Sequence, residues 1–319
     1  RHTRYISVTG VDVCSSDLYL QYLLTYDISK MIMHEAHYSL ACYADGGIVD
    51  DLFVYRMPDR YFIAINASNT VKDAQWFQLH THGFDVKVEN ISETTYMLAL
   101  QGPLAAEILQ PLADIDLSTM PYHTAQDGSV AGVPTLVARS GYTGEDGFEL
   151  FFPADKATVV WDAIMEIGTP KGLLPIGLAA RDSLRFEPCM PLYGQEISAE
   201  ISPLEAGLGW AVSFNKGPFI GREPLLKEKF EGTEMKLVGF EMVDKGVPRH
   251  EHEVAIDDEI VGEVTTGMFS PATGRYVGLA YVPTEDSALG TEIEIIIRDK
   301  ARRAVIVKRP FYVPAYRRK

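Results

Sequence analysis

Two hydrophobic periodicities alternate along the first two-thirds of the chain. Runs of apolar or alternating residues, typical of strands, stand between segments whose apolar residues recur at helical spacing. The segments interleave without the regular repeat of a parallel sheet, and residues 48–66 read as a hairpin. We therefore predict α+β layers with antiparallel strands. The expected strands are 5–8, 37–43, 48–57, 61–66, 85–88, 96–100, 135–139 and 148–152, and the expected helices are 19–24, 71–82, 104–112, 156–167 and 176–187.

The pattern changes after Pro203. A short helix is expected at 224–230 and a linker at 231–234, after which only strand-like runs remain. Spaced strands with turn residues between them predict a small β-barrel or sandwich. The boundary near Glu231 gives domains of residues 1–230 and 235–319, and the 319-residue length suits about two domains. The expected barrel strands are 237–242, 259–265, 277–282, 292–297 and 304–307.

One carboxylate interrupts an apolar strand. Glu149 lies within the strand expected at 148–152, where a charge is strongly unfavourable unless hydrogen-bond donors face it. Either an arginine or a bound ligand must supply these donors, and the residues leave both open. The preceding loop carries Gly141, Gly144 and Gly147, which permit positive φ and close approach of a ligand.

Two adjacent acids, Asp50 and Asp51, open the strand expected at 48–57. Because side chains alternate along a strand, these acids point to opposite faces, so one can meet solvent while the other faces a pocket. A carboxylate at a pocket edge can orient or stabilise an amine whose charge changes during a reaction. Alternatively, both acids only cap the entry of the strand.

Two arginines, Arg181 and Arg185, lie one turn apart on an expected helix. Arg181 can neutralise Glu149, bind a ligand oxygen or form a structural salt bridge, and the residues alone favour the salt bridge. The loop at 191–196 offers Tyr193 for stacking on a planar ligand, or it is a surface turn.

Composition narrows the class of protein. The content of 46% hydrophobic and 23% charged residues is that of a globular protein, and no apolar run approaches the ~18 residues of a membrane span. Three scattered cysteines offer neither a disulfide framework nor a metal site, which predicts a reducing, cytoplasmic location. The net charge of −15 argues against nucleic acid. Because the chain begins with Arg1, we expect a processed form or a fragment.

The charge is distributed unevenly. Residues 298–319 carry nine basic residues against one acidic residue, leaving 20 basic and 43 acidic residues elsewhere. This segment is either a docking surface for an acidic partner or a set of solvated strand faces with a frayed tail.

Motifs for dinucleotides, phosphate loops, zinc proteases and α/β hydrolases are absent from the sequence. The residues alone therefore indicate a two-domain protein with an acid-lined pocket for a planar ligand that has donor edges. A pterin fits this description, because its ring N–H and exocyclic amino group form a donor pair that one carboxylate can accept.

A set of ordered motifs makes the chain resemble the aminomethyltransferases, or T-proteins, of the glycine cleavage system. The resemblance covers about residues 19–312, whereas residues 12–18 depart from it, and family members have further residues before the position of Arg1. The motifs lie at 37–39, 46–55, 66–67, 99–103, 141–149, 177–187, 190–196, 202–210, 219–221, 262–271 and 310–312.

This resemblance implies a three-lobed cloverleaf with ferredoxin-like N-terminal lobes and a small C-terminal β-barrel. It implies tetrahydrofolate as co-substrate, no metal, and the lipoylated H-protein as partner. The implied reaction transfers the aminomethyl group from the lipoyl arm to tetrahydrofolate, yielding methylene-tetrahydrofolate, ammonia and the dihydrolipoyl arm.

The resemblance also implies roles for single residues. Asp51 matches the essential aspartate of the family, expected to orient the folate and to stabilise positive charge on the attacking amine. Glu149 matches the acid that holds the pterin edge, and Arg181 matches a further folate-site residue. The basic segment at 298–319 then fits docking of an acidic H-protein. The other residues expected at the folate site are Tyr38, Asn66, Tyr142 and Tyr316.

Two related activities are the alternatives. A folate-dependent demethylase of a methylated amine or sulfonium compound would use the same pocket, and its substrate choice lies in few residues. A folate-binding protein of iron–sulfur cluster assembly carries a Lys-Gly-Cys motif before its Gly-Gln-Glu. Here Met190-Pro191-Leu192-Tyr193 precedes Gly194, so this second alternative is disfavoured.

Overall fold

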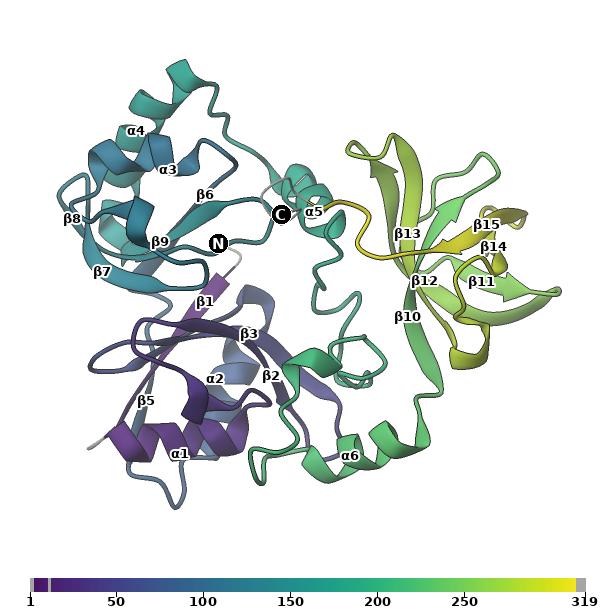
Figure 1. Cartoon of the computed structure of the whole chain (residues 1–319), viewed down its shortest axis with the longest axis horizontal. Helices are drawn as coiled ribbons and strands as arrows, with labels where there is room; N and C mark the ends of the chain where they lie inside the picture. Colours follow the sequence, from purple (N-terminus) through teal and green to yellow (C-terminus); the bar gives the residue numbers. More distant parts are fainter. Residues whose placement is uncertain (1–2, 11–12, 314–319) are drawn as a thin grey trace.

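Three lobes surround a common centre in the computed structural model, which describes residues 3–10 and 13–313 (Figure 1). The first two lobes each contain an antiparallel sheet with helices, and the third is a closed β-barrel. The predicted α+β class and the C-terminal barrel are therefore confirmed. None of the helices in these residues has the length and apolarity needed to cross a membrane.

The first lobe is built on a five-stranded sheet in the order β2-β3-β4-β1-β5. The predicted hairpin is present, since β3 and β4 pair antiparallel. Helix α1 buries Tyr19, Leu20 and Leu23 in the core of this sheet because these residues share one helical face. The elements are β1 (Thr3–Gly10), α1 (Val13–Leu23), β2 (Ala36–Cys42), β3 (Ile48–Arg56), β4 (Tyr61–Asn66), α2 (Thr70–Leu79) and β5 (Val86–Asn90).

The second lobe is a four-stranded sheet in the order β6-β9-β8-β7. Helix α4 contributes Val160 and Ile164 to its core, while Trp161 on the same helix stays 42% exposed. The prediction missed β7. The elements are β6 (Thr95–Gln101), α3 (Ala105–Leu109), β7 (Ala125–Val130), β8 (Val133–Ala138), β9 (Gly147–Pro153) and α4 (Ala157–Gly168).

An aromatic cluster joins the two sheets. Phe151 on β9 lies 5.0 Å from Phe62 on β4 and 5.3 Å from Tyr5 on β1, measured between ring centroids, and both pairs meet edge to face. Buried aromatic pairs of this kind stabilise beyond the area they bury. The first two lobes therefore share a continuous apolar contact and hold each other in a fixed relation.

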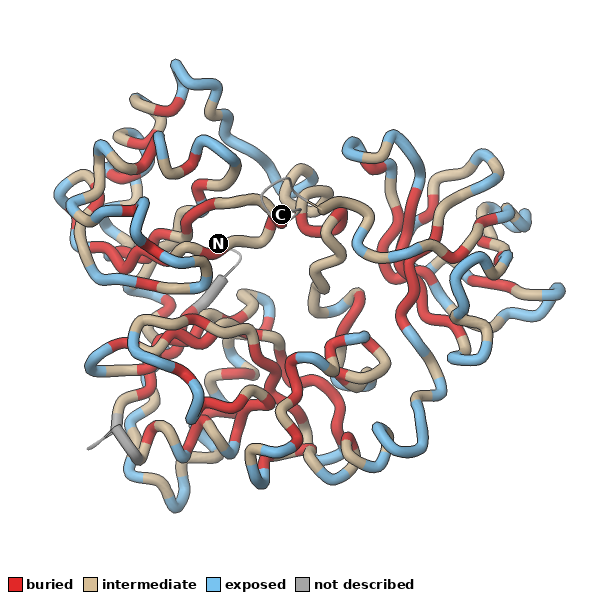
Figure 2. Tube along the Cα trace, viewed as in Figure 1, coloured by how far each residue is buried: buried red, intermediate tan, exposed pale blue. Residues whose placement is uncertain are grey.

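The third lobe is the barrel, closed in the order β10-β13-β12-β11-β14-β15. All five predicted barrel strands are present, and the prediction missed the short β11. Figure 2 shows buried residues running along the barrel strands, as along the sheets of the other lobes. The remaining elements are α5 (Leu178–Phe186), α6 (Arg222–Glu231), β10 (Met235–Met242), β11 (Glu253–Ile256), β12 (Glu259–Ser270), β13 (Arg275–Pro283), β14 (Glu292–Ile296) and β15 (Ala301–Val307).

Candidate functional site

A cavity of about 830 Å³ lies where the three lobes meet. Its volume is within the usual range for small-molecule sites. Six of the seven predicted site residues line it, although they come from five different segments of the chain. The seventh, Tyr316, lies outside the described residues. The six lining residues are Tyr38, Asp51, Asn66, Tyr142, Glu149 and Arg181.

Asp51 presents its carboxylate to the cavity from β3. Asn66 Nδ2 donates to Asp51 Oδ1 at 2.7 Å, and the Tyr38 hydroxyl donates to Oδ2 at 3.1 Å. Burial, followed by the charge of neighbouring Asp50, raises the pKa of Asp51 to about 7, although both hydrogen bonds oppose this rise. The group therefore changes charge near neutral pH.

Asp50 points to the opposite face of β3, as the strand period predicts. That face is not solvent, however, because Asp50 is only 1% exposed. Asn66 and Asn69 donate side-chain hydrogen bonds to its Oδ1 at 3.0 and 2.7 Å. The interpretation that one acid of the pair meets solvent was wrong, since α2 and the segment before it cover this face.

Glu149 receives its hydrogen bonds from two hydroxyl groups. Ser140 Oγ donates to Oε2 at 2.5 Å and the Tyr55 hydroxyl at 3.4 Å. Burial raises the pKa of Glu149, while these hydroxyls and the charge of Arg181 act against the rise. The expectation that only an arginine or a ligand could supply donors was wrong. Among the described residues, no hydrogen bond reaches Oε1, so half of the carboxylate remains available to a ligand.

The glycine-rich loop behaves differently from the prediction. Only Gly144 of its three glycines has a positive φ, at 73°. A Cβ atom at Gly141 would lie 1.9 Å from Gln101 Oε1, and one at Gly147 would lie 2.5 Å from Gln101 Cδ. These two glycines thus make room for a side chain of the protein. Gln101 Nε2 in turn donates to the Ser140 carbonyl at 3.0 Å and fixes the loop beside Glu149.

Arg181 stacks on the Tyr142 ring, with its Cζ 4.6 Å from the ring centroid. In the part of the chain that the structure describes, no ion pair joins Arg181 to Glu149 or to another carboxylate. The salt-bridge interpretation of Arg181 was therefore wrong. The buried structural pair belongs to Arg185, whose Nη1 lies 2.6 Å from Glu196 Oε2.

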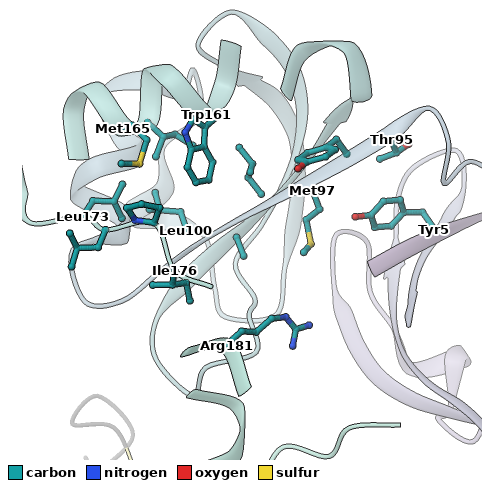
Figure 3. Close-up of a pocket in the computed structure, with 15 residues that line it drawn as sticks. Tyr5, Thr95, Met97, Leu100, Trp161, Met165, Leu173, Ile176 and Arg181 are labelled. Carbon is teal, nitrogen blue, oxygen red and sulfur yellow. The ribbon is translucent and has the colours of Figure 1, made fainter. Parts of the chain in front are cut away.

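A second cavity, of about 320 Å³, adjoins the first at Arg181 (Figure 3). Trp161 and Met165 on α4 surround it together with Leu173 and Ile176 in the segment that follows. Arg181 is the single charged residue among its described lining residues. Arg181 therefore lies on the wall of both cavities.

Several cavity residues escaped the sequence analysis. Trp210 is 71% exposed and stacks on Tyr38 at a centroid distance of 5.4 Å, which gives the cavity an aromatic wall. The sequence did contain a signal for this residue, namely a tryptophan within the glycine-rich stretch before Phe214. Tyr193, for which stacking on a ligand was one of two alternatives, donates to the Ile48 carbonyl at 3.1 Å and does not line the cavity. The barrel and the segment after it contribute Lys236, Lys308, Arg309 and Tyr312.

The arrangement suits a planar ligand with polar edges. Aromatic rings from Tyr38, Trp210 and Tyr142 offer stacking faces, while Glu149 and Asp51 offer carboxylate oxygens at separate points of the wall. Asp51 can accept a proton or stabilise a cation near neutral pH. Fold and site together define an α+β protein with a C-terminal barrel and a cavity suited to such a ligand between its lobes.

Comparisons with known proteins agree with this class. The model of the GCVT N-terminal domain matches residues 1–216, and that of the glycine cleavage T-protein C-terminal barrel domain matches residues 236–312. The chain therefore belongs to the glycine cleavage T-protein family.

Individual relatives match nearly the whole chain. An aminomethyltransferase of Anoxybacillus flavithermus is 49% identical over 98% of this chain and 85% of its own length. Another, of Thermoanaerobacter sp., is 46% identical over 99% of this chain and 86% of its own length. The crystal structure of the glycine cleavage system aminomethyltransferase T from Bartonella henselae is 29% identical, with a TM-score of 0.89, over 98% of this chain and 84% of that one.

Proposed function

We propose that this protein is a tetrahydrofolate-dependent aminomethyltransferase of glycine cleavage. It takes the aminomethyl group from the lipoyl arm of an H-protein and forms methylene-tetrahydrofolate, ammonia and the dihydrolipoyl arm. The observation that carries this proposal is the convergence of six residues, chosen from family motifs, on one cavity. Relatives named aminomethyltransferase along nearly the full chain support it.

We assign the chemistry to Asp51. Two amine hydrogens of the folate must leave as the carried carbon bridges its two nitrogens, one ending on ammonia and one on the lipoyl sulfur. A carboxylate beside those nitrogens stabilises the positive charge that develops on the attacking amine. Asn66 and Tyr38 fix the Asp51 carboxylate for this role through their hydrogen bonds to its two oxygens.

We assign folate binding to the remaining residues. Glu149 offers its Oε1 to the donor edge of the pterin, and Tyr142 with its stacked Arg181 lines the same wall. Tyr316 is proposed as a further contact. The domains are proposed at residues 1–230, which carry most of this site, and 235–319.

The direct test is an assay with tetrahydrofolate and aminomethyl-loaded H-protein. The wild-type chain is expected to release ammonia and form methylene-tetrahydrofolate in equal amounts. A chain that binds folate but releases no ammonia would overturn the proposal. A folate-dependent demethylase is not favoured, because the matching relatives carry the name aminomethyltransferase. Demethylation of methylated amines in the same assay would favour it instead.

Substitution of Glu149 by glutamine should weaken tetrahydrofolate binding by about 2–4 kcal/mol, because a charge-assisted pair to the pterin edge is lost. A glutamine oxygen can still accept from Ser140, so the fold should persist. Titration calorimetry measures the change, and Glu107→Gln, whose side chain is 62% exposed, serves as the matched control. Equal affinities of Glu149→Gln and wild type would contradict the assignment.

We also propose that the basic segment at 298–319 docks an acidic H-protein. Arg298 and Lys300 are exposed on the barrel, and Lys308 and Arg309 continue the charge to the cavity wall. Added salt should therefore raise the KM for H-protein several-fold and leave the KM for tetrahydrofolate nearly constant. Arg298→Glu should raise it at low salt, whereas Lys87→Glu on β5, also exposed, should not. A KM independent of salt would count against this docking surface.

We place the protein in the cytoplasm. Of its three cysteines, Cys42 and Cys189 are free thiols, as a reducing compartment maintains them. Labelling of both thiols in cell extracts prepared under a thiol-blocking reagent would test this location, and finding them oxidised would contradict it.

A further inference from the structure

A second buried carboxyl group stands behind the strand that carries Asp51. Asp73 on α2 is 1% exposed, and its Oδ1 receives a hydrogen bond from Lys72 Nζ at 2.7 Å. Its Oδ2 has no hydrogen-bond partner among the described residues, although it is fully buried. A buried polar atom without a partner is costly, so something must satisfy this oxygen.

The Asp50 carboxylate is the neighbour within hydrogen-bond reach of Asp73. Two ionised carboxylates side by side in a buried site repel each other, and a proton on Asp73 removes the repulsion. That proton would also let the unpartnered Oδ2 of Asp73 donate to Asp50. Burial, followed by Asp50, raises the pKa of Asp73 to about 9, which agrees with a proton held here at neutral pH.

Asn66 connects this pair to the cavity. Its backbone N–H donates to Asp50 Oδ2 at 3.1 Å, and its side-chain Nδ2 donates to Asp50 Oδ1 at 3.0 Å and to Asp51 Oδ1 at 2.7 Å. An amide nitrogen carries two hydrogens, so one serves each carboxylate. The orientation of the amide, and with it the position of the Asp51 carboxylate, depends on Asp50 remaining an acceptor on both oxygens.

We propose that Asp73 carries the proton that it shares with Asp50 in a hydrogen bond, and that the two act as a positioning pair, which holds Asn66 and, through it, Asp51 in the orientation that aminomethyl transfer needs. This inference rests on the proposed role of Asp51. The charged and titratable groups that face the pair are Asp51 on β3, Lys72 on α2, Tyr38 on β2 and Tyr193 in the loop after α5.

The first test replaces Asp50 by asparagine. The NH₂ group of the new amide would face one of the N–H donors of Asn66, and the repulsion between the two donors would displace the Asn66 side chain. We therefore expect kcat to fall about 10–100-fold, while the Kd for tetrahydrofolate changes less than about twofold. The acid limb of kcat/KM against pH should also move below its wild-type position, because the charge of Asp50 helps to raise the pKa of Asp51. The shift of the limb reports the charge of Asp50, whereas the loss of kcat at unchanged folate affinity reports its positioning role.

The same substitution in an Asp51→Asn background separates this inference from the proposed function. If Asp50 acts through Asp51, the double variant should be no slower than Asp51→Asn alone. An inactive Asp51→Asn beside an Asp50→Asn variant with wild-type kcat and pH limb would overturn the positioning role only. A fully active Asp51→Asn would overturn the role of Asp51, and the inference with it.

The shared proton has its own measurement, which stands even if Asp50→Asn fails to fold. The infrared difference spectrum of wild type minus Asp73→Asn, at about pH 7, should contain the C=O band of a protonated carboxyl group. Asp73→Leu should lower kcat about tenfold, and Asp73→Asn should recover most of that loss because an amide can still donate to Asp50. Absence of the band, or equal kcat of the two variants, would overturn the shared proton. Asp155→Asn, with a side chain that is 70% exposed, is the matched control.

Discussion

Substitution of Asp51 by asparagine is expected to lower kcat for aminomethyl transfer by about 10²–10⁴-fold, with little change in the affinity for tetrahydrofolate. The amide is nearly isosteric, and its oxygen can still accept from Asn66 while its nitrogen faces the Tyr38 hydroxyl. What it cannot do is carry the negative charge that stabilises the attacking amine. Ammonia release measured with aminomethyl-loaded H-protein gives kcat, and calorimetry gives the folate affinity.

The pH dependence of the wild type provides the control for this result. Because the pKa of Asp51 is raised to about 7, the active carboxylate is lost as the pH falls through that value. Below about pH 7, kcat/KM should therefore fall roughly tenfold for each pH unit, and Asp51→Asn should lack this limb. Asp155→Asn, exposed on the second lobe, should retain both the rate and the limb. Wild-type turnover in Asp51→Asn would remove Asp51 from the reaction.

Hydrophobic patterning predicts those elements of this fold whose residues form compact apolar runs bounded by turn residues. Strand β4, which is apolar from Tyr61 to Ile65, is predicted with its bounds, and the five predicted barrel strands follow from their spacing. Strand β7 was missed because its sequence, Ala-Gln-Asp-Gly-Ser-Val, is mostly polar and holds a glycine. It is a strand because β8 supplies its hydrogen bonds along six residue pairs. Tertiary pairing overrides local preference here.

The residues of the site also fall into a group that the sequence predicts and a group that it does not. Motif positions were sufficient to select Asp51 and Glu149, since each chemistry-bearing residue lies in a short recognisable segment. The residues that complete the wall, such as Trp210, Lys236 and Tyr312, depend on how the barrel is set against the other two lobes. That arrangement arises from contacts between distant parts of the chain, which periodicity does not encode.

Glu149 illustrates the limit most directly. The cost of burying its carboxylate correctly predicted that hydrogen-bond donors face it. The donors, however, are the hydroxyls of Tyr55, 94 residues away, and of Ser140. Hydroxyl residues are common throughout the chain, so the sequence draws attention to arginine first. The charge of Glu149 suggested Arg181 as its partner, whereas two neutral hydroxyl groups donate to one of its two carboxylate oxygens.

The arginine that does form a buried ion pair connects α5 to the barrel. Arg185 is 0% exposed, and its Nη1 bonds Glu196 while its Nη2 donates to Thr266 on β12 at 3.1 Å. Glu196 is equally buried and accepts from Thr265 and Thr266 at 2.9 and 2.5 Å. The contacts with Thr265 and Thr266 join the segment around α5 to the third lobe, so the network fixes one wall of the cavity relative to another.

Arg185→Met is therefore expected to lower the free energy of unfolding by about 3–5 kcal/mol, because it leaves the Glu196 carboxylate buried without its counter-charge. Adding Glu196→Gln to this variant should recover part of the loss, since the glutamine is neutral and its oxygen can still accept from the threonines. The exposed pair of Arg275 and Glu241 is the matched control, and Arg275→Met should cost no more than about 1 kcal/mol. Denaturant unfolding measures all three variants. If the double variant were less stable than Arg185→Met alone, the loss would come from packing of the long arginine side chain rather than from an unpaired charge.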